Sequence, residues 1–244
     1  DPFYYAQLKD RGLLLPHASP GSADLPEGLR DPENAFTTVR VPLMVIVVNH
    51  DRVPITDHPA SFKALVDPKY KGKVSMGDPL KSGTNFTTVA ALSKLYGWEY
   101  FEALHGNGVV SQGGNSAVLH RIETGERPIG VILLENVLPR IAKGAPLTIV
   151  YPTDGAIPIP SPVAIMKSTS DPELAKRVQD LFFLPEVQAA IVEGHMYSPL
   201  PNFAPPNGGR PWEDLEIYPW TAAFVDQVKR ERNAIKKRFL DVMR

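Results

Sequence analysis

The segment Met76–Thr88 constrains the fold more than any other part of the sequence, because it joins a strand end, a polar loop and a helix start. The β-prone run 72–76 stops at Gly77-Asp78-Pro79, and Ser82-Gly83-Thr84 then opens a helix with apolar residues near helical spacing. The first N–H groups of a helix have no partner within it, so they form a potential anion site beside two hydroxyls. An ordinary helix with Ser82 as N-cap explains the same pattern.

Composition limits the classes of protein. The chain has 244 residues and is 43% hydrophobic, which allows one large domain or two lobes. A net charge of −1 favours neither nucleic acid nor a membrane surface as a partner. The absence of cysteine excludes disulfides and thiol catalysis but leaves the cellular compartment open. No apolar run approaches the ~20 residues of a membrane span, and the start at Asp1-Pro2-Phe3 resembles the interior of a domain.

The periodicity of apolar residues predicts a mixed α/β chain. The run Val39–Asn49 is apolar and β-prone, and Pro42 within it indicates a strand that passes between two sheets. Further strands are expected at 127–134, 147–151 and 163–167, and helices within 2–15 and at 89–104, 170–183, 185–193 and 220–243. Gly97 should divide the second of these helices into two pieces.

Two other sites place polar side chains where a helix begins. Asn115 is the expected N-cap of a helix that follows Gly113-Gly114, and Glu135-Asn136 follows a buried strand. Open α/β sheets bind ligands beyond the carboxyl ends of their strands. Helix capping by Asn136 explains the second site equally well.

Catalysis has little support in the sequence. The six histidines are scattered, without a zinc-binding spacing, and the phosphate-binding loop, nucleophile elbow and dinucleotide motifs are all missing. A nucleophilic role for Ser82 would need a histidine placed by the fold. The basic runs 229–232 and 236–238 are typical of a solvated helix face rather than of a nucleic-acid site. The sequence therefore predicts no catalytic residue, no metal ligand and no cofactor.

Several motifs, taken in order, resemble the ferric-binding-protein-like branch of the periplasmic solute-binding proteins of ABC importers. These motifs are Asp1–Tyr4 with Lys9–Leu14, Arg40–Ile46, Asp67–Val74, Asp78–Thr84, Gly113–Ser116 and Leu181–Gln188. The resemblance implies the type II fold, with two α/β lobes joined by crossing strands, here 39–48 and 158–165. It places residues 1–44 and 160–200 in lobe 1, and 45–159 and 201–244 in lobe 2. The opening β-α-β units of the family are absent before Asp1, so lobe 1 is expected to be incomplete.

The resemblance also implies a binding site. Ser82, Gly83, Thr84 and Asn85 match the family's anion-binding helix start. Asn115, Glu135 and Asn136 would contact the rest of the solute, with Asp1 and Pro2 at the edge of lobe 1. Ferric members hold iron with a tyrosine pair where this chain has Glu135-Asn136. The loss of two phenolates argues against iron, since it removes most of the hard anionic shell that ferric ion needs.

The resulting prediction is a monomeric periplasmic receptor, without enzymatic activity, that serves an ABC importer. Its expected partners are a small anionic solute, either an organophosphate or a phosphonate, and an ABC permease in the membrane, with no nucleic acid. Three alternatives stay open. They are a ferric-iron receptor that uses carboxylates and a bound anion, the ligand-sensing module of a signalling receptor, and an enzyme of the same fold.

Overall fold

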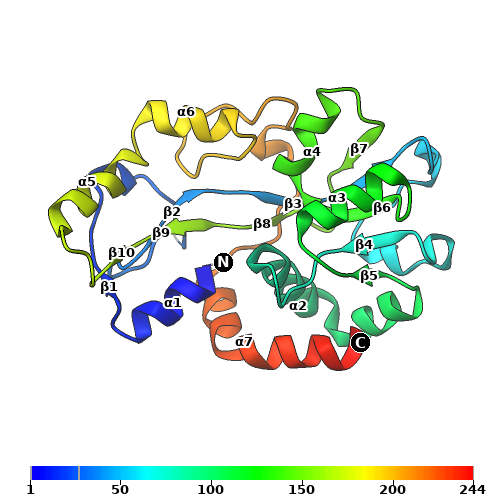
Figure 1. The fold of residues 1–244 in the computed structure, drawn as a ribbon, viewed down its shortest axis with the longest axis horizontal. Coiled ribbons are helices and arrows are strands. Elements are labelled where there is room, and N and C mark those ends of the chain that lie inside the picture. The colour runs from blue at the N-terminus through cyan, green and yellow to red at the C-terminus, as the bar shows by residue number, and fades with distance from the viewer. Residues whose placement is uncertain (1, 27, 244) are drawn as a thin grey trace. The chain divides into compact units, whose positions relative to one another are not determined.

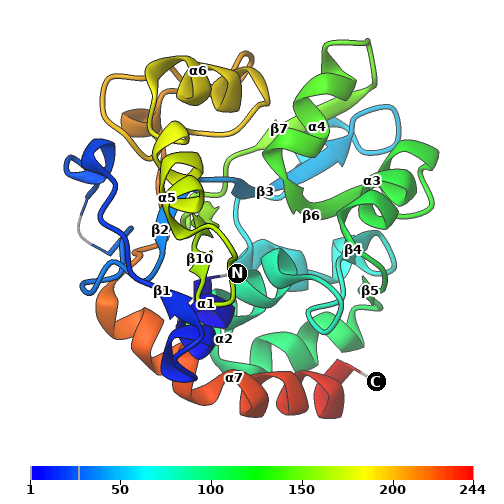
Figure 2. The ribbon, with the colours of Figure 1, turned by 60° about the vertical axis from the view of Figure 1, so that its left-hand side comes forward.

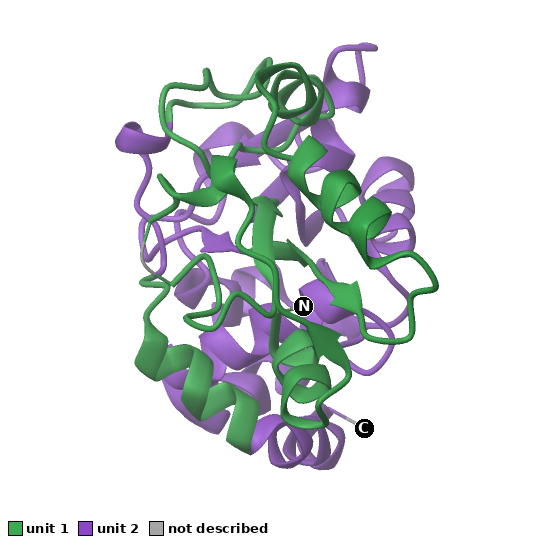
Figure 3. Ribbon diagram, turned by 90° about the vertical axis from the view of Figure 1, so that its left-hand side faces the viewer, with its two compact units in different colours: residues 1–42, 159–211, 219–230 green, residues 43–158, 212–218, 231–244 purple. Residues whose placement is uncertain are grey.

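The structure is a computed structural model that describes residues 2–26 and 28–243. The chain forms two compact units, shown in Figure 3. Unit 1 contains residues 1–42, 159–211 and 219–230, and unit 2 contains residues 43–158, 212–218 and 231–244. The lobes predicted from the sequence are bodies that move relative to each other, and compact units in a single structure do not define such bodies. The predicted lobe boundaries therefore stay a prediction.

Unit 2 is built on a six-stranded mixed sheet (Figure 1). Its strands are β3 (Leu43–Asn49), β4 (Val74–Met76), β5 (Val110–Ser111), β6 (Ile129–Leu133), β7 (Leu147–Val150) and β8 (Ile157–Pro158). The order is β5-β4-β6-β3-β7, and β8 also pairs with β3. Strand β4 is parallel to both β5 and β6, whereas β3 is antiparallel to β6, β7 and β8. The sheet therefore has one parallel half and one antiparallel half.

Strand β3 forms the centre of this sheet. All seven of its residues are buried, as its continuous apolar run predicts. It pairs with β6 from Met44 opposite Leu133 to Val48 opposite Ile129. The α-helices that lie wholly within unit 2 are α2 (Gly83–Gly106), α3 (Asn115–Thr124) and α4 (Leu134–Ile141). Helix α3 packs on β4 and β6, and α4 packs on β3 and β7, so both help to bury the sheet.

Helix α2 is divided at Gly97, as the sequence predicts. Gly97 has φ 73° and ψ −175°, which interrupts the helical backbone. Beyond this break, the buried ring of Phe101 contacts Phe239 with ring centroids 5.8 Å apart. The break therefore lets the second part of α2 pack against the end of α7 (Ala222–Met243).

Unit 1 contains two separate two-stranded sheets instead of one large sheet. Strand β1 (Leu14–Leu15) pairs with β10 (Ile165–Met166), and β2 (Thr37–Arg40) pairs with β9 (Ser161–Val163). The helices of unit 1 are α1 (Pro2–Asp10), α5 (Pro172–Leu181), α6 (Pro185–Glu193) and the part of α7 up to residue 230. A small buried cluster of Leu25, Val39 and Phe183 holds part of this unit together.

Two predicted strands are each divided in the structure. The run 39–49 breaks at Val41 and Pro42 into β2 and β3, which belong to different sheets, so the expected change of sheet at Pro42 is confirmed. The single strand expected at 163–167 is wrong, because β9 ends at Val163 and β10 begins at Ile165. The long helix expected at 220–243 is confirmed, with Phe224, Val228, Ile235 and Phe239 buried.

The break at Gly97 can be tested with a matched pair of alanine substitutions in α2. The φ/ψ region of Gly97 is nearly exclusive to glycine, so Gly97→Ala should lower the free energy of unfolding by about 1–3 kcal/mol. Gly106→Ala, where a Cβ meets no atom within 4 Å, should instead raise it by about 0.4–1 kcal/mol. Urea denaturation measures both. Equal effects of the two substitutions would contradict this account of the break.

Candidate functional site

Three helix starts follow three neighbouring parallel strands of unit 2. Strands β5, β4 and β6 lie side by side, and their chain direction is the same. They lead into α3, α2 and α4, respectively (Figure 2). The carboxyl ends of parallel strands meet at one edge of a sheet, which is where open α/β sheets bind ligands. This edge therefore carries three helix N-termini, each with a partial positive charge.

The loop between β4 and α2 is held by its own hydrogen bonds. The Asp78 side chain is 2% exposed, and its Oδ1 accepts a hydrogen bond from the Leu80 N–H at 2.9 Å. The Asp78 carbonyl oxygen accepts from the N–H groups of Lys81 and Ser82, and the Asp78 N–H donates to the carbonyl oxygen of Gly113 at 2.8 Å. The loop is thus tied both to itself and to the segment before α3.

Gly77 lets Asn85 approach the backbone closely. A Cβ on residue 77 would lie 2.3–2.6 Å from the side-chain amide atoms of Asn85. The Asn85 side chain is fully buried, and its Oδ1 accepts a hydrogen bond from the Gly77 N–H at 3.1 Å. Only glycine leaves room for this contact.

That contact sets the polarity of the neighbouring hydrogen bonds. Because a backbone N–H can only donate, the Asn85 Oδ1 must face Gly77 and the Asn85 Nδ2 must face away from it. The Asn85 Nδ2 donates to Ser82 Oγ at 3.0 Å and to Asn115 Oδ1 at 3.1 Å. With its Oδ1 used as an acceptor, Asn115 donates from Nδ2 to Thr84 Oγ1 at 3.2 Å. One backbone donor therefore orients two side-chain amides.

The hydroxyl groups of Ser82 and Thr84 lie at the end of this series of hydrogen bonds, and one of their two hydrogens is not used within it. Ser82 Oγ and Thr84 Oγ1 each accept from an amide, and they lie 3.0 Å apart, so one hydroxyl donates to the other. The second hydroxyl hydrogen has no acceptor within this cluster. Both residues are partly exposed, so this hydrogen can be donated to a ligand.

The start of α2 adds backbone donors to the same place. Ser82 is the N-cap, as predicted, with its Oγ 3.5 Å from the N atom of Asn85 and its carbonyl oxygen accepting from the N–H of Phe86. The first N–H groups of a helix have no partner within it. In the described part of the chain, no hydrogen bond links the N–H of Gly83 or of Thr84 to another residue. These donors and the surplus hydroxyl suit an oxyanion.

Asn115 does not have the capping role that the sequence suggested. Gly114 is the N-cap of α3, and Asn115 is the first residue of the helix. The preceding Gly113 has φ 72°, which directs the chain into this start. Since the Asn115 side chain is not used for capping, both ends of its amide can bond to Asn85 and Thr84.

Glu135 and Asn136 lie in the first turn of α4 and are half-buried. The N-cap of α4 is Leu133, so capping by Asn136 is wrong. The Asn136 Oδ1 is buried and has no hydrogen-bond partner among the described residues. Both residues share the sheet edge with Ser82 and Asn115, but no hydrogen bond found among these residues joins the two groups.

The two remaining predicted site residues belong to unit 1. Asp1 lies outside the described residues, and Pro2 is buried as the first residue of α1. Gly77 and Asp78 also belong to the site, although they are not among the site residues predicted from the sequence. A glycine directly after a buried strand and a loop aspartate before proline were the signals that could have identified them.

Across 2–26 and 28–243, no helix is both long enough and apolar enough to cross a membrane. The same residues contain no group of three or more His, Asp or Glu side chains placed to hold a metal ion.

Comparison with known proteins shows the family. Residues 1–223 match the family described as bacterial extracellular solute-binding protein. An uncharacterized protein of Haemophilus influenzae is 29% identical over 188 residues, which are 72% of this chain and 54% of that protein. The chain thus spans about half the length of this relative.

Two solved structures show the fold. The periplasmic binding protein AfuA of Actinobacillus pleuropneumoniae, solved with fructose-6-phosphate bound, is 23% identical with a TM-score of 0.85. The apo ferric ion-binding protein A of Pasteurella haemolytica is 19% identical with a TM-score of 0.82. Each match covers 99% of this chain and 80% of the other. The predicted type II binding-protein fold is confirmed, and the chain belongs to the family of bacterial extracellular solute-binding proteins.

Proposed function

We propose that the chain is the receptor of an ABC importer and that it binds a small anionic solute, an organophosphate or a phosphonate. The observation that supports this most is the surplus of donors around the α2 start. The N–H groups of Gly83 and Thr84 and one hydroxyl of the Ser82–Thr84 pair all offer hydrogen to the same region. A phosphate or phosphonate group has several acceptor oxygens and a negative charge, so it matches this set of donors.

In this proposal Asn85 acts through its neighbours instead of touching the solute. Its side chain is fully buried, and both of its amide hydrogens are already donated to Ser82 and Asn115. Asn85 therefore orients the donors, while Ser82, Gly83 and Thr84 contact the anion. Asn115 holds the Thr84 hydroxyl in place from the start of α3.

The start of α4 would contact the uncharged or cationic part of the solute. Glu135 supplies a carboxylate, and the Asn136 Oδ1 is a buried acceptor with no hydrogen-bond partner in the described chain. A buried acceptor without a donor is unfavourable, and a solute hydroxyl or amine would satisfy it. An organophosphate with such groups fits this arrangement better than inorganic phosphate does. The proposed contacts of Asp1 and Pro2 would lie in unit 1.

One helix start cannot account for tight binding. A helix N-terminus contributes about 0.3–2 kcal/mol toward an anion, whereas micromolar affinity requires about 8 kcal/mol. The remainder must come from the hydroxyl and amide donors and from closure of the protein around the solute, which excludes water. We infer hinged closure because the chain passes repeatedly between its two compact units, for example after Pro42 and after Pro158.

The first prediction concerns the Thr84 hydroxyl. Thr84→Val keeps the shape of the side chain but removes its hydroxyl, so affinity for a phosphate ester should fall about 10-fold, the value of one hydrogen bond. Thr84→Ser keeps the hydroxyl and should bind like the wild type. Isothermal titration with phosphate esters, aminophosphonates and inorganic phosphate measures both variants. Unchanged affinity of Thr84→Val would count against the donor site.

The second prediction concerns Asn115. Asn115→Asp cannot donate to Thr84 Oγ1 and places a negative charge beside the anion, so affinity should fall roughly 10–100-fold. Asn233→Asp is the matched control, since it makes the same change of charge at an exposed position of α7. A similar loss in both variants would mean that net charge, and not the Asn115 contact, controls binding.

The ferric receptor is the principal alternative, because one relative of the same fold is a ferric ion-binding protein. A tyrosine-bound ferric ion absorbs visible light, but this chain has Glu135-Asn136 at the position of the tyrosine pair. An iron site made of carboxylates and an anion need not give this band, so iron retained by the protein after desalting is measured as well. We expect ferric citrate to leave neither a visible absorption band nor bound iron on this protein. A saturable band that forms at one iron per chain would restore the ferric alternative.

A membrane-spanning segment elsewhere in the gene would instead favour the signalling-receptor alternative.

A further inference from the structure

Two basic residues of α7 lie against the first turn of α2, and all of these residues belong to unit 2. The guanidinium carbon of Arg232 is 5.1 Å from the centroid of the Phe86 ring, and the Lys236 Nζ is 5.6 Å from it. Both distances are within the range of cation–π contacts. The Phe86 side chain is fully buried, and both basic residues are half-buried. Arg232 and Lys236 therefore depart from the solvated helix face that the sequence predicts for the basic runs of α7.

The charge of Lys236 is not neutralised within the described chain. No ion pair found there includes Lys236, and the nearby Glu231 is paired with Lys94. Burial and, to a smaller extent, the neighbouring Arg232 lower the pKa of Lys236 below its usual value. A carboxylate beside the ammonium group would act in the opposite direction. The start of α2 therefore has an uncompensated positive charge beside it.

The loop before α2 provides no net positive charge of its own. Within residues 77–90 the charged side chains are those of Asp78 and Lys81. The Asp78 side chain is 2% exposed, so water screens its charge little, whereas Lys81 is exposed and well screened. Asp78 would therefore repel an anion at the α2 start unless positive charge from another element offsets it. Arg232 and Lys236 can supply that charge, because they lie against the same helix start.

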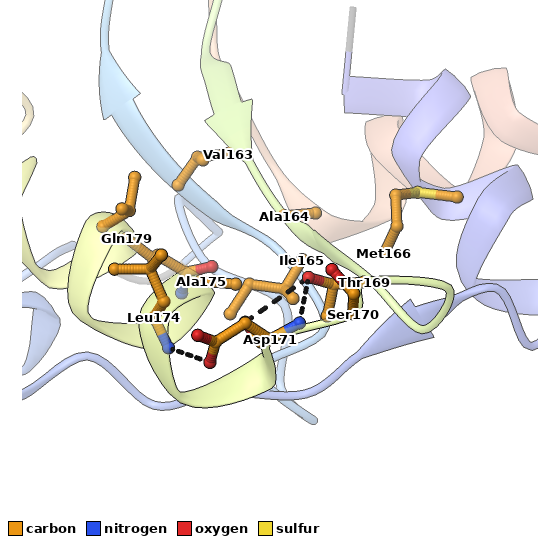
Figure 4. A pocket seen from close by; sticks show the side chains of 11 residues that line it. Val163, Ala164, Ile165, Met166, Thr169, Ser170, Asp171, Leu174, Ala175 and Gln179 are labelled. Carbon is orange, nitrogen blue, oxygen red and sulfur yellow. Dashed lines mark hydrogen bonds between the residues drawn. The ribbon is translucent and has the colours of Figure 1, made fainter.

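The groove in unit 1 is a contrasting case. It has a volume of about 410 Å³ and lies between α5 and the strand segment 163–166 (Figure 4). The described residues that line it include no lysine or arginine, and the charged side chain among them is that of Asp171. Most of the other lining side chains are apolar. Positive charge and unused hydrogen-bond donors thus coincide at the α2 start and not in this groove.

Helix geometry gives the distance over which the two cations act. Phe86 is four residues after Ser82, about one helical turn, so Arg232 and Lys236 lie roughly 10 Å from the first N–H groups of α2. This distance is comparable to the Debye length of about 8 Å at physiological ionic strength, and partly buried charges are screened less. We propose that Arg232 and Lys236 make the start of α2 electropositive and so raise its affinity for anions. The inference rests on the proposed function, because it concerns the same binding site.

The thiol of Ser82→Cys tests this without any solute, because the chain contains no cysteine. A thiol at a helix start has a pKa below the ordinary value of about 8.5, and nearby cations lower it further. Lys236→Met keeps the aliphatic part of the side chain but removes the charge. It should raise the thiol pKa by about 0.3–1, the effect of one charge at roughly 10 Å. Arg232→Met should act in the same direction, and the rate of thiol alkylation against pH measures both.

Lys237→Met is the matched control. Lys237 is the next residue of α7 and is exposed, so this variant makes the same change of net charge. Because water and salt screen an exposed charge, it should change the thiol pKa by no more than about 0.1. Val178→Cys supplies a second thiol in the groove of unit 1, and the pKa of that thiol should not respond to Lys236→Met.

Equal effects of Lys236→Met and Lys237→Met on the thiol pKa at position 82 would overturn the inference. With Ser82 intact, Lys236→Met should also weaken binding of a phosphate ester by about 2–10-fold, as the expected change in thiol pKa implies. Unchanged affinity would overturn the inference while the proposed function holds. A protein that binds no phosphate ester, although its thiol pKa responds to Lys236→Met, would instead contradict the proposed function.

Discussion

The candidate site depends on the hydrogen bond from the Gly77 N–H to the Asn85 Oδ1. A backbone N–H cannot act as an acceptor, so this bond fixes the orientation of the Asn85 amide and, through it, that of Asn115. The orientation of Asn115 in turn determines the hydrogen bond to Thr84, because the Thr84 hydroxyl oxygen accepts from the Asn115 amide. Side-chain amides and hydroxyls can usually donate or accept. Here one fixed donor leaves unused hydrogen-bond donors at the start of α2. The site therefore presents donors, and not acceptors, before a solute binds.

Local features of this site could be predicted from the sequence, whereas its connections could not. Ser82 caps α2 and Gly97 interrupts it because both effects arise from residues near in sequence. Asparagine favours the N-cap position, which predicts Asn115 there, but Gly114 occupies it. The bond from Asn85 to Asn115 joins residues 30 apart in the chain. It depends on β4 and β5 being parallel neighbours, which no local pattern reveals.

The two units are stabilised in different ways. Unit 2 has a central strand, β3, that is buried along its whole length, so its sheet can hold three helix starts at one edge. The described part of unit 1 has two small sheets, and Leu174, Val178 and Leu181 on one side of α5 are exposed. Sequence patterns gave the helices of both units correctly, because amphipathic spacing is local. They did not show which apolar helix faces are buried by packing within residues 1–244. The sequence pattern of α5 is that of a helix packed on a core, although its apolar face is exposed.

A crystal structure of the protein with a bound phosphate ester tests the central claim most directly. The account predicts that the phosphate oxygens lie within hydrogen-bonding distance of the N–H groups of Gly83 and Thr84 and of a hydroxyl of Ser82 or Thr84. It also predicts that the Asn85 amide keeps its bonds to Gly77 and Asn115 and does not touch the ligand. A phosphate bound elsewhere, with the α2 start unoccupied, would contradict the account, as would a phosphate bound directly by a reoriented Asn85.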